Sequence, residues 1–392
     1  MRVPPSYHLL NRLLARHMPY LRPAQRQGLA WWVCGTILAG SACQSAVVTA
    51  LAGTESTERW RQYLREWLYD GADRASPCQT CLEVSTCFAP LLGWVLSWWH
   101  ATQLALAIDA TYQRDRWVVL SVSVLYRGSA IPVAWQVLPG NTPVSWGPAL
   151  TKLLSQLAPC IPPTMTVLVL TDRGLWSPRL WEQLRRLGWH PLMRLRPEAT
   201  FAPTGATRQP AAGLLAGPGT AWVGRGTAFK EPRRQQVGTL LAVQTVEAAE
   251  PWLLLTDLPP AKTGLSWYSL RAWIEVSFRN VKRFGWQWQR TRRQNPDRIA
   301  RHWLVLSVAT LWVLACGTRI EDAEQSRVDP SRLRYPPPRP TPVPRRRSLF
   351  QRGLTLLRRH LLTNGLWQRL WLVPEPWPDT PPDLIVTYHD SS

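Results

Sequence analysis

The chain has 392 residues, of which 45% are hydrophobic, so it can bury a large core in roughly two or three domains. Its 46 lysines and arginines outnumber 25 acidic residues, which gives a formal charge of +21. This excess predicts a polyanionic partner, with nucleic acid favoured over an anionic membrane surface. A GC-rich genome would also give many arginines, prolines and tryptophans, so the composition alone does not decide that the partner is nucleic acid.

The sequence predicts a cytoplasmic protein without a membrane anchor. The best apolar run, residues 302–316, is shorter than the roughly 20 residues that a membrane-spanning helix needs. The first residues lack the apolar core and cleavage site of a signal peptide. Seven cysteines are an odd number, and Cys78, Cys81 and Cys87 make only half of a zinc site, so neither disulfides nor structural zinc is expected.

Residues 1–100 are predicted to form a helical domain, because apolar residues recur there at helical spacing. The family resemblance given below implies that this domain binds DNA. The break at Gly40 and Ser41 fits either a helix-turn-helix or an ordinary helical hairpin. The fourth helix places Arg59, Arg61 and Arg65 near one another, where they suit DNA phosphates. The predicted helices are Ser6–Arg16, Pro23–Ala39, Ser45–Leu51 and Thr57–Tyr69.

In residues 101–198 the spacing of apolar residues changes from that of helices to that of strands with intervening helices, which predicts an α/β domain. Three antiparallel strands, a helix, a strand, a helix and a fifth strand follow one another, which is the order of an RNase H-like mixed sheet. Asp109 and Asp172 each lie at a strand end, where their side chains can converge. The predicted strands are 104–110, 117–128, 130–140, 165–174 and 190–196, and the helices are 143–157 and 178–187.

Residues 199–263 predict a β-rich insertion before the last part of the domain. A stretch rich in glycine, proline and threonine is followed by strand-like segments at 221–229, 236–246 and 252–258. The family resemblance given below implies that a tryptophan of such an insertion can contact an unpaired base, and Trp222 and Trp252 are the candidates, although a core position is the more frequent role of a tryptophan.

Residues 264–320 complete the predicted domain, beginning with a helix at Tyr268–Lys282. Tyr268, Arg271, Glu275 and Lys282 fall within roughly 60° of one another around this helix, and Arg279 shares their face. A surface helix with a chance charge pattern is the alternative.

After this helix, Arg283, Trp286 and Trp288 belong to a segment of interleaved aromatic and basic residues, typical of nucleic-acid binding. Residues 297–316 predict a buried helix. Residues 321–348 are predicted to be a proline- and arginine-rich linker, and residues 349–392 a final helix and tail that contact either DNA or a second subunit.

The Y-x2-R-x3-E-x6-K spacing resembles the Tyr-Arg-Glu-Lys signature of DDE-type insertion-sequence transposases, specifically insertion-sequence family four. IDATYQ around Asp109 and LTDRG around Asp172 resemble the two aspartate motifs of the same group. The resemblance covers about residues 100–320. It implies that Asp109, Asp172 and Glu275 are the catalytic, metal-binding carboxylates.

The resemblance implies two Mg²⁺ or Mn²⁺ ions per site, which suit carboxylate ligands and in-line phosphodiester chemistry. It also implies binding to double-stranded DNA, namely terminal inverted repeats and target, by a homodimer at the bacterial nucleoid. Residues expected to contact DNA are Tyr268, Arg271, Arg279, Lys282, Arg283 and Trp288. A nuclease of the same fold that does not join strands, and an inactive domesticated DNA-binding protein, are the alternatives.

Overall fold

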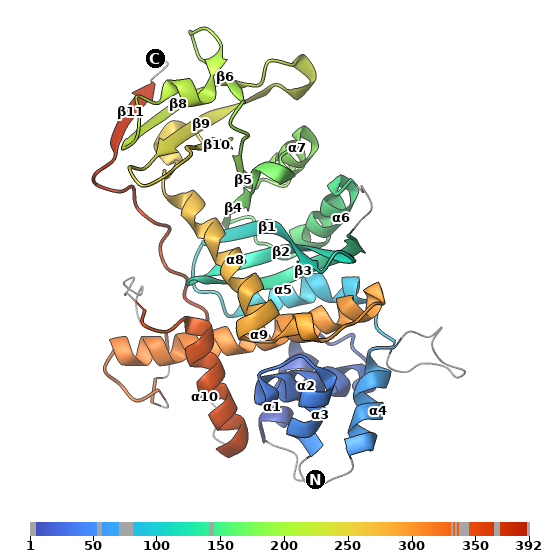
Figure 1. Ribbon diagram of the computed structural model, residues 1–392. Coiled ribbons are helices and arrows are strands. Elements are labelled where there is room, and N and C mark those ends of the chain that lie inside the picture. The colour runs from blue at the N-terminus through green and yellow to red at the C-terminus, as the bar shows by residue number, and fades with distance from the viewer. Residues whose placement is uncertain are drawn as a thin grey trace.

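A mixed β-sheet runs through the centre of the protein (Figure 1), of which the computed structural model describes residues 5–52, 57–69, 81–140, 145–330, 332–333, 335–336, 345–363 and 369–389. The first five strands lie in the order β3-β2-β1-β4-β5. Strands β1, β2 and β3 are antiparallel neighbours, whereas β4 runs parallel to both β1 and β5. The predicted RNase H-like sheet is therefore confirmed. These strands are β1 (Gln103–Gln113), β2 (Trp117–Tyr126), β3 (Ser129–Pro139), β4 (Thr166–Thr171) and β5 (His190–Arg194).

The register of the sheet brings the two predicted aspartates to one place. Asp109 lies opposite Ser121 of β2, and its neighbour Ile108 pairs with Thr171, the last residue of β4. Asp172 follows Thr171 directly. Parallel pairing of β1 and β4 thus places side chains 63 positions apart at the same edge of the sheet.

The β-rich insertion continues the same sheet. Its strand β10 (Trp252–Thr256) pairs antiparallel with β5, and the order then runs β10-β9-β8-β6-β7. The three strands predicted for this region are all present, at positions shifted by one or two residues, because their apolar residues are strongly β-forming. The other insertion strands are β6 (Thr200–Pro203), β7 (Gln209–Pro210), β8 (Thr220–Ala228) and β9 (Gln236–Gln244).

The helices of the catalytic part pack against these strands. Helix α8 (Ala272–Arg279) contacts β1, β2 and β3, and the Ser277 hydroxyl donates to the Ala130 carbonyl oxygen at 2.9 Å. Helices α6 (Gly147–Leu157) and α7 (Pro178–Arg186) confirm the two predicted helices. The predicted start of the first, at 143–144, lies outside the described residues.

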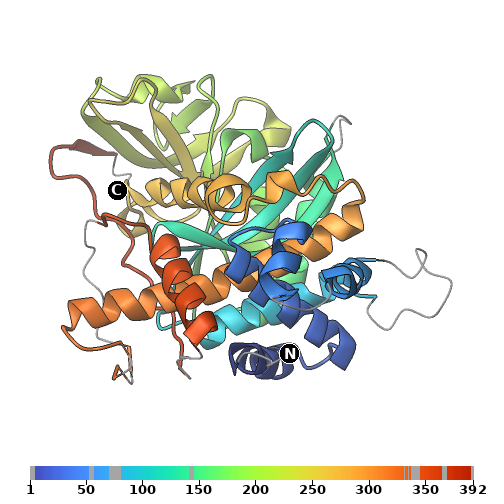
Figure 2. The same ribbon diagram turned by 60° about the horizontal axis from the view of Figure 1, so that its bottom comes forward.

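Helix α9 (Pro296–Gln325) lies between the sheet and the N-terminal helices, in contact with β3 and α2 (Figure 2). It is longer than predicted and takes up the first five residues of the expected linker at 321–348. Its length and composition would suit a membrane span, as would the bent pair α2–α3, but 94% of its apolar window is buried within the protein. Such burial is that of a core helix.

Helices α1 to α4 lie on the side of α9 away from the sheet (Figure 1) and match the four predicted ranges closely, whereas α5, which was not predicted, packs against β3. Gly40 ends α2 in the left-handed conformation, with φ of 59°, and the chain bends by 92° into α3. This angle is in the range of a helix-turn-helix, but α3 carries no lysine or arginine. The exposed arginines Arg59, Arg61 and Arg65 lie on α4. The helices are α1 (Pro5–His17), α2 (Pro23–Ala39), α3 (Gln44–Ala52), α4 (Thr57–Trp67) and α5 (Phe88–Ser97).

The C-terminal segment packs on the same chain. Helix α10 (Leu349–Thr363) contacts α9 and α2, and the backbones of α9 and α10 come so close that a Cβ at Gly353 would lie 1.9 Å from the Val313 carbonyl oxygen. The chain then runs up the molecule, and β11 (Ile385–His389) pairs parallel with β8 (Figure 1). This last strand was not predicted. The buried Arg127 side chain holds the segment by donating to the Val373 carbonyl oxygen at 2.7 Å.

Candidate active site

The three predicted carboxylates come from three different elements. Asp109 lies on β1, Asp172 follows β4, and Glu275 lies on α8. Asp172 caps a short 3₁₀ turn, since its Oδ1 accepts the backbone N–H of Arg173 at 2.8 Å. Asp109 Oδ1 accepts the backbone N–H of Ala110, also at 2.8 Å. Both aspartates are thus held by the local backbone.

The guanidinium of Arg271 lies between these three carboxylates. Its Nη2 is 2.9 Å from Asp109 Oδ2 and 3.6 Å from Asp172 Oδ2, and its Nη1 is 2.6 Å from Glu275 Oε1. The Arg271 side chain is 12% exposed, against 58% for Glu275. One side chain therefore joins residues that the sequence separates widely, and the structure brings the predicted catalytic residues together.

Burial and charge act in opposite directions on this cluster. Burial raises the pKa of Asp109, as do the nearby Asp172 and Glu275, whereas Arg271 acts to lower it. Burial acts to lower the pKa of Arg271, but the negative charge around it, first that of Asp109, outweighs burial and raises it. Arg271 is therefore a permanent cation at the centre of the cluster.

The donor set of this cluster suits a hard divalent cation. Carboxylate oxygens are the preferred ligands of Mg²⁺, and Asp109, Asp172 and Glu275 supply three such groups at one edge of the sheet. As they stand, no three acidic, histidine or cysteine side chains among the described residues are placed to share a metal ion. Instead, the two terminal nitrogens of Arg271 contact one oxygen of each of the three carboxylates.

Tyr268 has a different place from the one predicted. Residues Trp267–Arg271 form a 3₁₀ turn before α8, and the Tyr268 ring is only 4% exposed. Its hydroxyl donates to the Thr171 carbonyl oxygen at 3.2 Å, next to Asp172. Burial raises its pKa, so the hydroxyl keeps its proton. Tyr268 thus fixes the end of β4, and a direct contact with DNA does not fit its position.

The predicted basic residues after Glu275 lie next to the carboxylates. A cavity of 370 Å³ is lined by Asp109 and Glu275 together with Arg279, Lys282 and Arg283. Lys282 lies in a π-helical turn at Asn280–Phe284, which continues α8. Burial, and then the charge of Arg283, lowers the pKa of Lys282. These cations are placed to receive phosphates beside the carboxylates.

Trp288 was predicted to contact DNA, and this prediction is wrong. The ring is 0% exposed and packs edge-on against Trp303 of α9, with ring centroids 5.4 Å apart. Trp286 is equally buried, and its Nε1 donates to the Thr310 hydroxyl. Trp222 and Trp252 also pack in the protein, against Phe201 and Tyr268 respectively. The aromatic residues that are exposed near the carboxylates, Tyr112 and Phe284, were not identified from the sequence.

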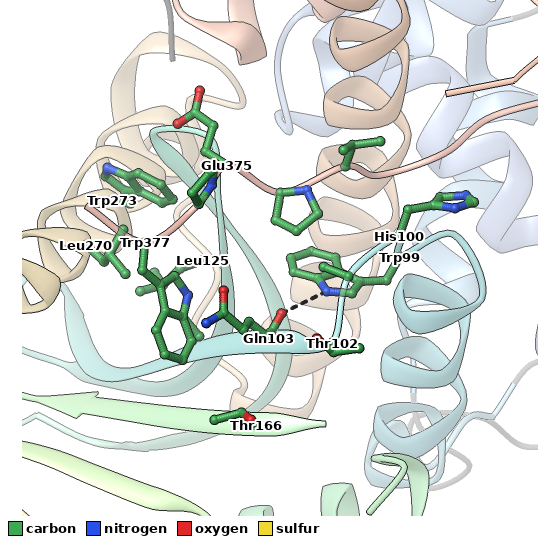
Figure 3. A pocket seen from close by; sticks show the side chains of 15 residues that line it. Trp99, His100, Thr102, Gln103, Leu125, Thr166, Leu270, Trp273, Glu375 and Trp377 are labelled. Carbon is green, nitrogen blue, oxygen red and sulfur yellow. Dashed lines mark hydrogen bonds between the residues drawn. The ribbon is translucent and has the colours of Figure 1, made fainter. Parts of the chain in front are cut away.

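A separate cavity, which does not belong to the candidate active site, lies away from the carboxylates. Its volume is 490 Å³, and Trp99, Gln103, Trp273, Glu375 and Trp377 are among its lining residues (Figure 3). It opens at the first residues of β1 and β4, whereas Asp109 and Asp172 lie towards the other ends of these strands. None of the three carboxylates lines it, so it is separate from the candidate active site.

The cysteines that make half of a zinc site in the sequence are only partly within the described residues. Cys81 and Cys87 are not in a disulfide, and Cys78 lies outside the described residues.

Comparisons with known proteins identify the family of this chain. The family model described as "Transposase DDE domain" matches residues 103–312, more than half of the chain, and this range contains all three carboxylates. A comparison with curated proteins finds no match. Among solved structures, the chain is similar to a piggyBac transposase in a synaptic complex with hairpin DNA, with a TM-score of 0.44 and 10% identity over 91% of this chain and 77% of that one. The match over residues 103–312 shows that the chain belongs to the family of transposases with a DDE domain.

Proposed function

We propose that this DNA transposase binds the ends of its insertion sequence and cuts and joins strands at Asp109, Asp172 and Glu275, with two Mg²⁺ or Mn²⁺ ions. The observation that carries the proposal is the convergence of the three carboxylates on one guanidinium. Two divalent ions in such a site activate the attacking oxygen and stabilise the leaving oxygen of an in-line displacement. Cleavage by water and joining by a 3′-hydroxyl are the same displacement, so one site can perform both.

The protein's own residues position the DNA. Arg279, Lys282 and Arg283 line the cavity beside Asp109 and Glu275, where they hold phosphates next to the scissile bond. The exposed arginines of α4 add phosphate contacts further from the site. An insertion sequence has two ends, and each chain has one candidate site, which supports a homodimer in the DNA complex.

Cleavage of a duplex that carries the element's own end tests the proposal. Asp172→Asn keeps the shape of the side chain but removes the charge that a metal needs. We expect it to abolish nicking in Mg²⁺ and to leave end binding unchanged, because phosphate attraction is not lost. Nicking by Asp172→Asn at the wild-type rate would contradict the assignment.

A comparison of nicking with strand joining separates a transposase from a nuclease of the same fold. A transposase must hold the cut end for the second reaction, so Lys282→Ala should depress joining more than nicking. A charged contact contributes about 1.5–3 kcal/mol, which is roughly ten- to hundredfold in retention of the end. The exposed Lys262 lines neither cavity described above, and Lys262→Ala is the matched control. Equal loss of both reactions would favour the nuclease.

A further inference from the structure

The cavity beside the carboxylates opens into a longer groove. A second cavity of 870 Å³ shares Tyr112, Lys282 and Arg283 with the cavity that holds Asp109 and Glu275. A third, of 130 Å³, continues past the turn between β1 and β2. We call the three together the basic groove.

The walls of the basic groove are strongly positive. The second cavity is lined by five cations, Arg114, Lys282, Arg283, Arg290 and Arg292, and by one acidic residue, Asp115. Arg114, Arg283 and Arg292 form no ion pair with any residue in the described part of the chain. Their charge is therefore available to a ligand, and the spacing along a groove suits a chain of phosphates.

Two aromatic rings are exposed at the end of the groove that contains the carboxylates. Tyr112 is 51% exposed and Phe284 is 66% exposed, and both line the cavity of Asp109 and Glu275. Poor packing of this segment does not explain the exposure of Phe284, because Trp286, two residues further on, is 0% exposed. Among the described residues no aromatic ring or cation stacks on Phe284, and its exposed phenyl ring suits the face of an unpaired base.

The backbone of the groove is also unusual. Arg114 and Arg292 both adopt the left-handed backbone conformation, with φ of 53° and 51°. Residues other than glycine, asparagine, aspartate and histidine rarely adopt this conformation. These two arginines line both the second and the third cavity. At both positions the left-handed backbone carries an arginine that lines the same groove.

From these observations we propose that the basic groove binds single-stranded DNA next to the catalytic carboxylates. The bases stack on Tyr112 and Phe284, and the phosphates follow Arg114, Arg283 and Arg292. A duplex would leave both rings unused, because its base faces are already stacked within the helix. This proposal rests on the proposed function, because it says where an unpaired DNA strand beside the cut would lie. The binding itself requires neither metal nor cleavage, so it can be measured separately.

Binding is measured by fluorescence anisotropy in EDTA, with a blunt duplex and with the same duplex carrying a single-stranded thymidine tail. Wild-type protein should bind the tailed duplex more tightly. Phe284→Ala and Tyr112→Ala should each reduce tailed binding by about tenfold, the usual effect of losing one stacked base, and leave blunt binding unchanged. Phe284→Leu keeps an apolar side chain but cannot stack, so it should behave as Phe284→Ala does. Phe284→Tyr should restore tailed binding.

Tyr388 provides the matched control. It is 63% exposed on β11, at the edge of the insertion, and it lines none of the three cavities. Tyr388→Ala should leave the preference for the tail intact. Equal binding of tailed and blunt duplexes by wild-type protein, or an equal loss in Tyr388→Ala and Phe284→Ala, would overturn the proposal. A tail preference without cleavage in Mg²⁺ would overturn the proposed function alone.

Discussion

The Nη2 atom of Arg271 lies 2.9 Å from Oδ2 of Asp109, although the two residues are 162 positions apart in the sequence. The same guanidinium reaches Asp172 and Glu275, so one cation offsets part of the charge of three carboxylates. We expect a metal bound at these three carboxylates to compete with the guanidinium for their oxygens. Arg271 released in this way would be available to DNA phosphates.

Replacement of Arg271 by glutamine should therefore lower the stability of the metal-free protein and increase the stabilisation that a bound metal gives. Three carboxylates left without their cation should destabilise the metal-free protein by about 1–2 kcal/mol, a value reduced from that of buried pairs because Glu275 is exposed. Mn²⁺ should raise the melting temperature of Arg271→Gln more than that of wild type, because no guanidinium has to be displaced. Thermal unfolding with and without Mn²⁺ measures both effects.

The control for this experiment is Arg61→Gln, which breaks an exposed pair with Glu58 on α4. It should change stability by less than about 1 kcal/mol and leave the response to Mn²⁺ as in wild type. If Mn²⁺ stabilises Arg271→Gln and wild type by the same amount, the guanidinium and the metal do not compete.

Tyr268→Phe tests whether the tyrosine positions Asp172 or contacts DNA. The variant removes the hydroxyl that donates to the Thr171 carbonyl oxygen, which should cost about 0.5–1.5 kcal/mol of stability. Because Asp172 follows Thr171 directly, cleavage of bound DNA should slow. End binding should stay unchanged, since the ring is 4% exposed. Weaker end binding with normal cleavage of the bound fraction would instead assign Tyr268 to the DNA interface.

Strong local patterns explain the parts of the fold that the sequence predicted. Strand β4 is a run of β-branched and leucine residues that ends at Thr171, directly before Asp172. Helix α2 begins at Pro23 and ends before Gly40, so the positions of both elements follow from local chemistry. The carboxylates could be found because Asp172 directly follows a strand and Glu275 lies on a helix with a recognisable spacing. Asp109 was predicted at a strand end, but β1 continues to Gln113, because its last residues still pair with β2.

Contacts between distant segments account for what the sequence did not show. A segment of alternating tryptophans and arginines can form either a DNA-binding surface or a buried core with arginines at its rim. Which of the two forms here depends on where α9 packs, because Trp288 is buried against Trp303 of that helix. The 3₁₀ turn before α8 moves Tyr268 inward, away from the face that a regular helix would give it. The pairing of β11 with β8 joins segments about 165 residues apart.

The buried His302 should make stability depend on pH. It lies on α9, is 0% exposed, and accepts a hydrogen bond at Nδ1 from Arg293 Nε at 3.1 Å. Burial, and then the charge of Arg293, lowers its pKa well below the ordinary value of 6.5. The unfolded chain therefore binds a proton below pH 6.5 that the folded protein excludes. Stability should fall as the pH drops below 6.5, by up to about 1.4 kcal/mol per pH unit.

Urea unfolding at pH 7.5 and pH 5.5 checks this effect. His302→Gln retains an acceptor for Arg293 but cannot titrate, so its loss of stability between the two pH values should be smaller than that of wild type by about 1.4 kcal/mol. The same substitution at the exposed His100 serves for comparison. An unchanged difference between the two pH values in His302→Gln would show that this histidine is not the group responsible.

Iron-directed cleavage of the polypeptide tests most directly whether Asp109, Asp172 and Glu275 share one metal site. Fe²⁺ bound in place of Mg²⁺ reduces added hydrogen peroxide to hydroxyl radicals, ascorbate regenerates the Fe²⁺, and the radicals cut the nearby backbone. The fragments show which residues surround the ion without requiring DNA or activity. Cuts should cluster near residues 109, 172 and 275, disappear with excess Mg²⁺, and be absent from Asp109→Asn. Cuts near only one of the three positions, or an unchanged pattern in Asp109→Asn, would contradict a shared site.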